Sequence, residues 1–183
     1  MHREPLLTLL RQHVSERRTA ADANEAAMTA QTIAFVETHP DCFERSLLEG
    51  HVTGSAWILS PDRQTVLLIH HRQLDRWFQP GGHADGNPDI AAVALQEAYE
   101  ETGLTDVRLV SPQIFDVDVH PIPERGEVPA HLHYDIRFQC VSNNKILFGE
   151  SREVKNVGWV SLTEAERLAN SESISRMIRK SRI

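Results

Sequence analysis

The sequence predicts an α+β domain in which helices flank a mixed β-sheet, preceded by a helical extension. Three features support this prediction: a helical pattern at the start, strand patterns through the middle, and a glycine loop that runs into a helix carrying three glutamates. The chain has 183 residues, which suits one domain with a substantial core. We expect the extension over residues 1–45 and the main domain over residues 46–183.

Composition argues against several classes of function. A formal net charge of −7 disfavours a nucleic-acid-binding surface, because phosphates require a basic face. The two cysteines are too few for a disulfide framework or a zinc site. No apolar run is long enough for a membrane span or a signal peptide. We therefore expect a cytoplasmic protein with no nucleic-acid and no membrane partner.

Two apolar patterns of helical period occupy the start of the chain. They are separated by a charged break at residues 15–18, and the second ends at Pro40. Such a helical pair is more often a packing or dimerisation element than a catalytic one, so a homodimer is one expectation. The positions at helical spacing are Leu6, Leu7, Leu10 and Val14 in the first helix, and Met28, Thr32, Phe35 and Val36 in the second.

Strand patterns begin at residue 51. Residues 51–60 and 65–71 are rich in β-branched and apolar residues, and the turn-forming residues 61–64 between them predict a hairpin. Residues 114–120 and 131–141 alternate apolar with polar side chains, which predicts two paired strands, each with one buried and one polar face. The end of the chain should add strands at residues 146–148 and 157–160 and short helices at residues 163–168 and 173–178.

The polar face of the second strand pair has two interpretations. A polar strand face is ordinarily in contact with water, but the density of carboxylate and imidazole groups here favours contact with a ligand. We select His131, His133 and Asp135 as substrate contacts, and the His-x-His pattern can also chelate a transition metal. The full polar set is Asp116, Asp118, His120, His131, His133 and Asp135.

A glycine loop and the helix after it form the centre of the pattern. Gly81 and Gly82 allow the backbone to come close to a substrate. Asn87 suits the helix N-cap and Pro88 suits the first helical position. Gly103 is a typical residue at which to end a helix. The sequence therefore predicts a short helix between Pro88 and Gly103.

Three carboxylates lie on one face of this helix. At about 100° per residue, Glu97, Glu100 and Glu101 fall within an arc of roughly 100°. Like charges at these spacings destabilise a helix unless a cation neutralises them. A hard divalent ion is the natural occupant, and we expect Mg²⁺, with Mn²⁺ as the alternative.

The loop and helix resemble the sequence box of the Nudix hydrolase family. Gly82 opens the box, and the second half of the box is filled in register. Two positions depart from the family pattern: Pro88 stands where a glutamate is expected, and Gln96 stands where an arginine is expected. The matching positions of the second half are Glu97, Ala98, Glu100, Glu101, Gly103 and Leu104.

The resemblance implies the Nudix sandwich of mixed sheets between helices. It also implies metal-dependent hydrolysis of a phosphoanhydride bond, so the expected partner is a small nucleotide or diphosphate substrate. Glu97, Glu100 and Glu101 would be the metal ligands, and Glu97 and Glu100 would also take part in catalysis. Further catalytic candidates are Asp85, Gln96 and Glu150. Substrate-contacting candidates in the loop are Gly81, Gly82 and His83.

Two alternatives stay open. The departures at Pro88 and Gln96 favour a nucleotide-binding or regulatory module with weakened catalysis, because a neutral amide cannot offset charge as an arginine does. Isomerisation of an isoprenoid diphosphate, an activity of the wider superfamily, would require a cysteine in the site. Cys140 lies on the apolar phase of its strand, which predicts a core position instead.

Overall fold

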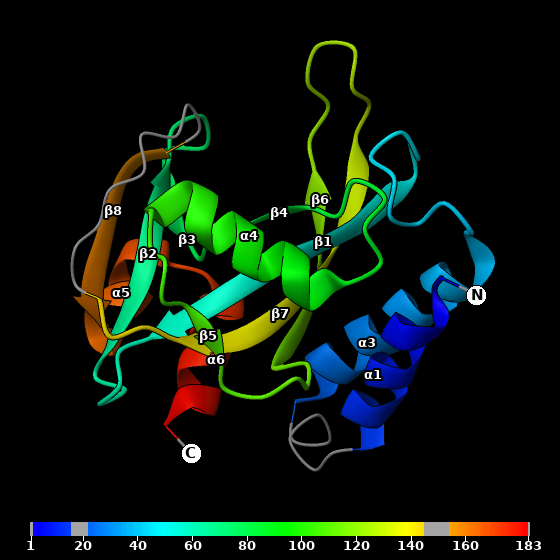
Figure 1. The fold of residues 1–183 in the computed structure, drawn as a ribbon. Coiled ribbons are helices and arrows are strands. Elements are labelled where there is room, and N and C mark those ends of the chain that lie inside the picture. The colour runs from blue at the N-terminus through cyan, green and yellow to red at the C-terminus, as the bar shows by residue number, and fades with distance from the viewer. Residues whose placement is uncertain (1, 16–21, 145–153, 183) are drawn as a thin grey trace.

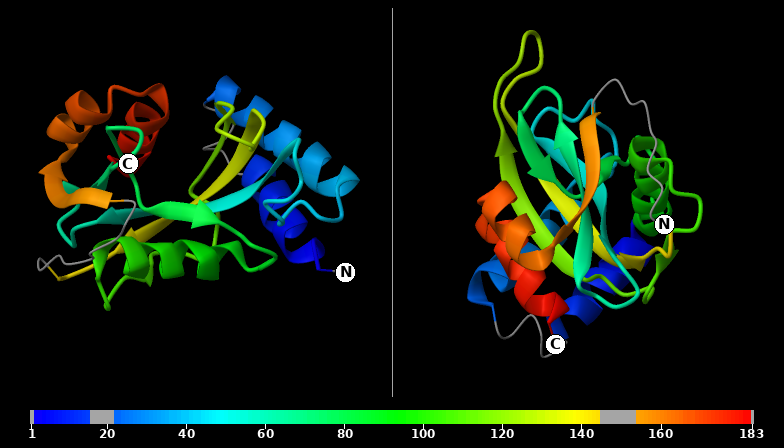
Figure 2. Two further views of the ribbon diagram at one scale, coloured as in Figure 1. Left: turned by 90° about the horizontal axis from the view of Figure 1, so that it is seen from above. Right: turned by 90° about the vertical axis from the view of Figure 1, so that its left-hand side faces the viewer.

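The computed structural model describes residues 2–15, 22–144 and 154–182. Within these residues an eight-stranded mixed sheet lies between helices on both faces (Figures 1 and 2). Helix α4 (Ile90–Thr102) covers one face, and α5 (Leu162–Ala169) and α6 (Glu172–Ser181) lie on the other. The predicted α+β class, with a mixed sheet between helices, is confirmed.

The strands are, in chain order, β1 (Gly50–Leu59), β2 (Thr65–His71), β3 (Arg76–Phe78), β4 (Gly81–His83), β5 (Arg108–Leu109), β6 (Asp116–Ile122), β7 (His131–Val141) and β8 (Val154–Ser161). The central strand, β1, pairs in parallel with β7 along its whole length. Its other edge pairs with β4. Strand β7 also pairs with β5 and β6, and β2 pairs with β3 and β8. The first residues of β1 and β7 therefore lie side by side, next to β4 and β6.

The predicted hairpin forms only at its turn, whereas the second predicted strand pair is confirmed. Strands β1 and β2 pair at one position, Leu59 with Val66, and then diverge. All residues of β1 are buried, so this strand needs partners on both edges to satisfy its backbone groups. Strands β7 and β4 supply those partners, and β2 pairs with β8 instead. Strands β6 and β7 are antiparallel from Asp116 opposite Arg137 to Ile122 opposite His131.

The two helices at the start of the chain pack into the same core as the sheet. They extend over α1 (Glu4–Ser15) and α3 (Ala23–Thr38), as their periodicity predicts. Phe35 on α3 stacks on Tyr134 of β7, with ring centroids 3.9 Å apart. Val14, expected on the apolar stripe, is exposed. The buried apolar side chains of these helices are Leu6, Leu7, Leu10, Phe35 and Val36.

The closing elements agree with the sequence where the structure describes them. Strand β8 contains the predicted strand at 157–160, and α5 and α6 contain the two predicted short helices. The strand predicted at 146–148 lies outside the described residues. Cys140 is fully buried, which confirms its core position. Among the described residues, no helix is both long enough and apolar enough to cross a membrane.

Candidate active site

Helix α4 begins later than the sequence pattern predicts. Asp89 is its N-cap and accepts a hydrogen bond from the Ala92 N–H at 3.1 Å. The Asn87 side chain instead accepts from the Asp89 N–H at 3.0 Å, which forms a turn ahead of the helix. The predicted N-cap at Asn87, with Pro88 as the first helical residue, is therefore wrong. Gly103 ends the helix with a left-handed φ of 71°, as predicted.

The glycine loop lies directly against α4. The Gly81 N–H donates to Glu101 Oε2 at 2.9 Å. A Cβ atom added at Gly82 would overlap the Glu97 carboxylate, and one added at Gly81 would overlap the Ser55 hydroxyl of β1. Close approach therefore requires glycine at both positions, and this approach brings two carboxylates of α4 onto the loop backbone.

The three glutamates of α4, termed the box acids, differ in exposure. Glu101 is buried, Glu97 is half-buried and Glu100 is exposed. The Gln96 amide donates to Glu100 Oε1 at 2.8 Å, so the residue that departs from the family pattern contacts a box acid. Helix α4 thus places Glu97 and Glu101 against the loop, with Glu100 beside Glu101 on the same helix. The resulting donor set consists of carboxylate oxygens.

Asp85, the catalytic candidate within the loop, is held by an ion pair. Its carboxylate accepts two hydrogen bonds from Arg45, one of them from Nε at 2.5 Å. The hydrogen bonds from Arg45 lower the pKa of Asp85, which makes this carboxylate a poor proton acceptor. Asp85 has a positive φ of 47°, so the ion pair also holds a turn of the loop. Glu150, another candidate, lies outside the described residues.

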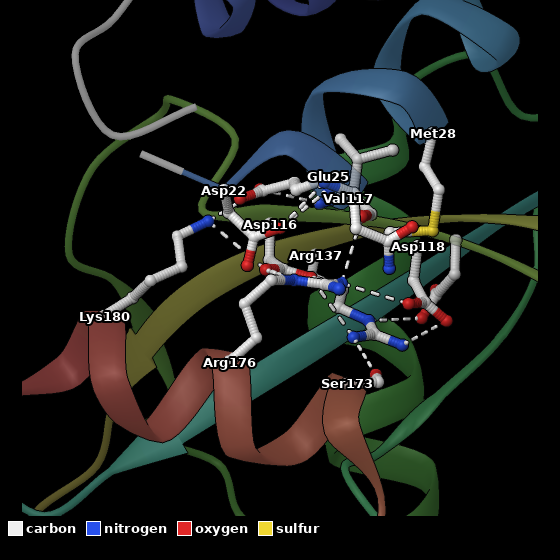
Figure 3. A network of polar contacts seen from close by, with 12 residues as sticks. Asp22, Glu25, Met28, Asp116, Val117, Asp118, Arg137, Ser173, Arg176 and Lys180 are labelled. Carbon is white, nitrogen blue, oxygen red and sulfur yellow. Dashed lines mark hydrogen bonds and ion pairs between the residues drawn. The ribbon is translucent and has the colours of Figure 1, made fainter. Parts of the chain in front are cut away.

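The predicted polar face of β6 and β7 is largely covered by α6. Asp116 is fully buried and Asp118 is nearly so; we term them the covered acids. Arg176 on α6 donates to Asp116 at 2.8 Å and to Asp118 at 3.0 Å (Figure 3). Arg137 on β7 also pairs with both carboxylates, and Lys180 pairs with Asp116 at 3.2 Å. The expectation that the covered acids face water or a ligand is wrong, because α6 supplies cations that the strand pattern does not reveal.

The same charge network reaches the N-terminal helices. Lys180 donates to Glu25 Oε1 of α3 at 2.6 Å, as Figure 3 shows. Glu25 is fully buried and also accepts from the Val117 N–H at 3.3 Å. His13 of α1 lies 2.9 Å from the same carboxylate oxygen. Elements from the start, middle and end of the chain therefore meet at one buried carboxylate.

Asp135 joins the two central strands of the sheet. Its carboxylate accepts hydrogen bonds from Thr53 at 3.0 Å and Ser55 at 2.7 Å, both on β1. It also accepts from Gln79 at 3.3 Å and from Arg137 Nε at 2.7 Å. Asp135 is only 3% exposed. Its predicted position on an open polar face is therefore wrong, because neighbouring donors already satisfy its oxygens and cover it.

The end of this face where β7 begins carries a group of histidines. His51, His131 and His133, termed the histidine cluster, lie where β1 and β7 begin, and His83 and His120 flank them. Burial, followed by the neighbouring histidines, lowers the pKa of His51 to about 4 and that of His133 to about 2. Both rings are therefore neutral near pH 7. The sequence pattern does not indicate that His51 belongs to this cluster, because it lies in a stretch read as an apolar strand. The strand register, which places His51 opposite His133, shows that it does.

Comparison with known proteins identifies the fold. The NUDIX domain family model matches residues 50–180. The MutT protein from Methanosarcina mazei Go1 has a similar structure, with a TM-score of 0.59 and 19% identity over 74% of this chain and 96% of that one. The structure of the E. coli dihydroneopterin triphosphate pyrophosphohydrolase is also similar, with a TM-score of 0.55 and 16% identity over 70% of this chain and 92% of that one.

A third similar structure is the NUDIX domain of Shewanella oneidensis NrtR, which was solved with ADP ribose. Its TM-score is 0.54, with 16% identity over 84% of this chain and 96% of that one. No curated protein matches the sequence. The solved structures share the fold, and the family match spans well over half of the chain, including the glycine loop, α4 and every described strand. The chain therefore belongs to the Nudix hydrolase family.

Proposed function

We propose that this chain hydrolyses a phosphoanhydride bond in a nucleoside diphosphate derivative or a related nucleotide, with Mg²⁺ as cofactor. The observation that carries this proposal is the packing of the glycine loop on α4, which brings Glu97 and Glu101 onto the loop backbone. The compounds named for two similar structures, dihydroneopterin triphosphate and ADP ribose, both contain phosphoanhydride bonds. They support the class of reaction. The nucleobase and the leaving group of the substrate require experiment.

The box acids suit a hard divalent ion. Mg²⁺ is usually bound by one or two carboxylates together with waters and substrate phosphates, and the donors here are carboxylate oxygens. The absence of a Cβ at Gly82 leaves room for the Glu97 carboxylate beside the loop backbone. When bound by Glu97, Glu100 and Glu101, Mg²⁺ would neutralise diphosphate charge and lower the pKa of an attacking water. Mn²⁺ accepts similar ligands and is the alternative.

The residues of α4 have separate tasks in this proposal. Glu101 is buried and holds the loop through the Gly81 N–H, which sets the spacing between loop and helix. Glu100 is the exposed box acid, and we assign to it, together with Glu97, the removal of a proton from the attacking water. Gln96 orients Glu100 through its amide hydrogen bond.

Residues of the loop would position the substrate. His83 directly follows Gly82, and it lies opposite Thr53 in the pairing of β4 with β1, so its side chain lies on the face away from α4. We assign His83 to substrate contact. The ion pair between Arg45 and Asp85 holds the turn after His83, so we assign Asp85 a positioning task.

An alternative function is nucleotide binding with weakened hydrolysis. The contact between Gln96 and Glu100 favours it, because a neutral amide stands where the family has an arginine. The isomerase alternative needs an accessible cysteine. Cys140 does not meet this need, because it is fully buried and burial raises the pKa of its thiol to about 12.

Hydrolysis of a substrate panel by the full chain tests the proposal. The panel contains nucleotide sugars, dinucleoside polyphosphates and nucleoside triphosphates, with and without Mg²⁺, and products are identified by chromatography. We expect Mg²⁺-dependent cleavage of at least one class, with turnover about 100-fold or more lower in Glu97→Gln. Tight binding of a nucleotide without turnover would support the binding module instead, and neither binding nor turnover would overturn both functions.

A further inference from the structure

The histidine cluster is assembled by strand pairing, on the face of the sheet opposite α4. His51 of β1 lies directly opposite His133 of β7 in the parallel register, and His131 is two residues earlier on the same face. Gly54 of β1 packs against Ile90 on α4, so the odd-numbered residues of β1, including His51, lie on the other face. The cluster and the box acids therefore belong to different surfaces of the sheet.

The two histidines of β7 have a spacing that fits a shared metal ion. The Nε2 atoms of His131 and His133 are 3.3 Å apart. Two imidazole nitrogens bound to one tetrahedral zinc ion, at about 2.0–2.1 Å each, lie roughly 3.3 Å apart. The nitrogen donors of His51, His131 and His133 all lie within 4.8 Å of one another. The separations among the three donors therefore exceed the 3.3 Å of the His131–His133 pair by at most 1.5 Å.

The tautomer of His131 suits metal binding. Its Nδ1 lies 2.8 Å from the Pro129 carbonyl oxygen. A carbonyl can only accept, so Nδ1 carries the proton and Nε2 of the neutral ring carries the lone pair. Hydrogen bonds from the second ring nitrogen to a backbone carbonyl typically orient histidine ligands in metal sites.

His51 provides an independent indication of a ligand. It is only 3% exposed, and the Leu47 backbone lies near enough to raise the pKa of its ring, but neither ring nitrogen makes a hydrogen bond of normal geometry to the described residues. A buried polar group without such a bond destabilises the fold unless another partner satisfies it. A hydrogen bond between His131 and His133 involves those two rings alone and gives His51 no well-formed hydrogen bond.

We propose that His51, His131 and His133 form a binding site for a divalent transition-metal ion, with Zn²⁺ as the expected occupant, separate from the box acids. Three imidazoles suit zinc and its neighbours in the transition series, whereas Mg²⁺ prefers oxygen donors. Three protein ligands leave a fourth position for water or an anionic oxygen. His131 and His133 are half-buried, so the ion can enter from solvent.

Metal titration of the full chain tests this site without any substrate. The chain is stripped with a chelator, placed in excess Mg²⁺ to occupy oxygen-donor sites, and titrated with Co²⁺, whose visible absorption reports tetrahedral nitrogen coordination. Zn²⁺ is then added as a competitor. We expect one Co²⁺ ion per chain, displaced by Zn²⁺, and a loss of affinity of about 100-fold or more in His131→Gln and in His133→Gln.

Two control variants locate the ion. His70→Gln removes a strand histidine outside the cluster, and Glu100→Gln removes a box acid; both should retain Co²⁺ affinity within about twofold. Long-range ¹H–¹⁵N spectra of the unmutated chain provide a readout that does not depend on folding of the variants, since Zn²⁺ should shift the ring nitrogens of all three histidines. Absence of Co²⁺ binding, binding lost in Glu100→Gln but retained in His131→Gln, or unshifted histidine rings would each overturn the proposal. Hydrolysis is not measured, so these results are independent of the proposed enzymatic function.

Discussion

Two groups of acidic residues lie on opposite faces of the sheet and have different partners. On the α4 side, Glu100 accepts from the Gln96 amide and Glu101 accepts from the Gly81 N–H, and both donors are neutral. On the α6 side, Asp116 and Asp118 are paired with arginines and a lysine (Figure 3). Both groups combine closely spaced carboxylates on regular elements. What distinguishes the two groups is the charge of these donors.

The difference teaches how a cluster of acids acquires its role. The covered acids pair with arginines. Removal of one partner from such a buried ion pair strongly destabilises the folded protein, because it leaves an unpaired buried charge. The box acids lie beside a glycine loop with an exposed member, Glu100, which leaves them suited to an external cation. Removal of a charged group from the α6 side should therefore lower the stability of the fold, whereas removal of a box-acid charge on the α4 side should lower turnover. The following predictions test that contrast, from the largest expected effect to the smallest.

Removal of a cation from the covered face should give the largest loss of stability. In Arg176→Met, Asp116 and Asp118 lose a buried partner, and we expect the free energy of unfolding to fall by about 3–5 kcal/mol. Urea denaturation measures this change. Arg179→Met on the same helix is the matched control; because Arg179 is exposed, its change should stay below about 1 kcal/mol. Equal effects of the two variants would contradict the contrast.

Removal of charge from the box acids should affect turnover far more than stability. In Glu97→Gln and Glu100→Gln, we expect kcat of the proposed Mg²⁺-dependent reaction to fall about 100- to 1000-fold, because each variant lacks a carboxylate that we propose as a metal ligand while keeping its volume. Steady-state kinetics at saturating Mg²⁺ and thermal melting of the same samples separate the two effects. Turnover within about threefold of the unmutated chain in both variants would remove the box acids from the metal site.

Acid should destabilise the protein through the covered acids. Burial would raise the pKa of Asp118, but the charge of Arg137 and its other partners lower it below the ordinary value of 3.8, and the pKa of Asp116 is lowered as well. Near pH 4 the folded chain therefore binds fewer protons than the unfolded chain. The stabilisation is fully present above this pH and is lost as the pH falls further.

Unfolding free energies measured from pH 6 down to pH 2.5 check this linkage. Asp118→Asn should show a shallower decline over the same range, because the variant has one fewer such carboxyl group to protonate. A decline of unchanged steepness would show that other groups cause the acid sensitivity.

An arginine at position 96 should give the box acids a charged donor, as the covered acids already have. In Gln96→Arg, a charged donor replaces the amide that contacts Glu100, and a nearby cation favours the ionised form of carboxylates. We expect the acidic limb of the Mg²⁺-dependent activity profile to move to lower pH by up to about one unit, with a change in maximal turnover below about tenfold. Profiles of both chains across mildly acidic and basic pH measure the shift. An unmoved acidic limb would mean that residue 96 does not act on the acids.

Predictions from the sequence were correct where the determinants are close together in the chain. A glycine predicts the end of α4 at Gly103. Alternation of apolar and polar residues predicts the pairing of β6 with β7, and helical periodicity predicts the two N-terminal helices. The sequence pattern places the N-cap of α4 two residues too early, because both Asn87 and Asp89 can cap a helix, and the Asn87 side chain accepts from the Asp89 N–H instead. The pattern also predicts a longer β1–β2 hairpin than the structure has, because β1 pairs with the distant strand β7.

By itself, the sequence determined the class of fold and a helix with three carboxylates after a glycine loop, because period, capping and spacing are local properties. Only the tertiary structure decided which polar groups are covered and which meet. Arg176 lies 60 positions after Asp116, and nothing in the strand pattern indicates that α6 brings it there. His51 joins His133 only through the parallel pairing of β1 with β7. Alternation along a strand specifies which side chains share a face, whereas what covers that face depends on elements far away in the chain.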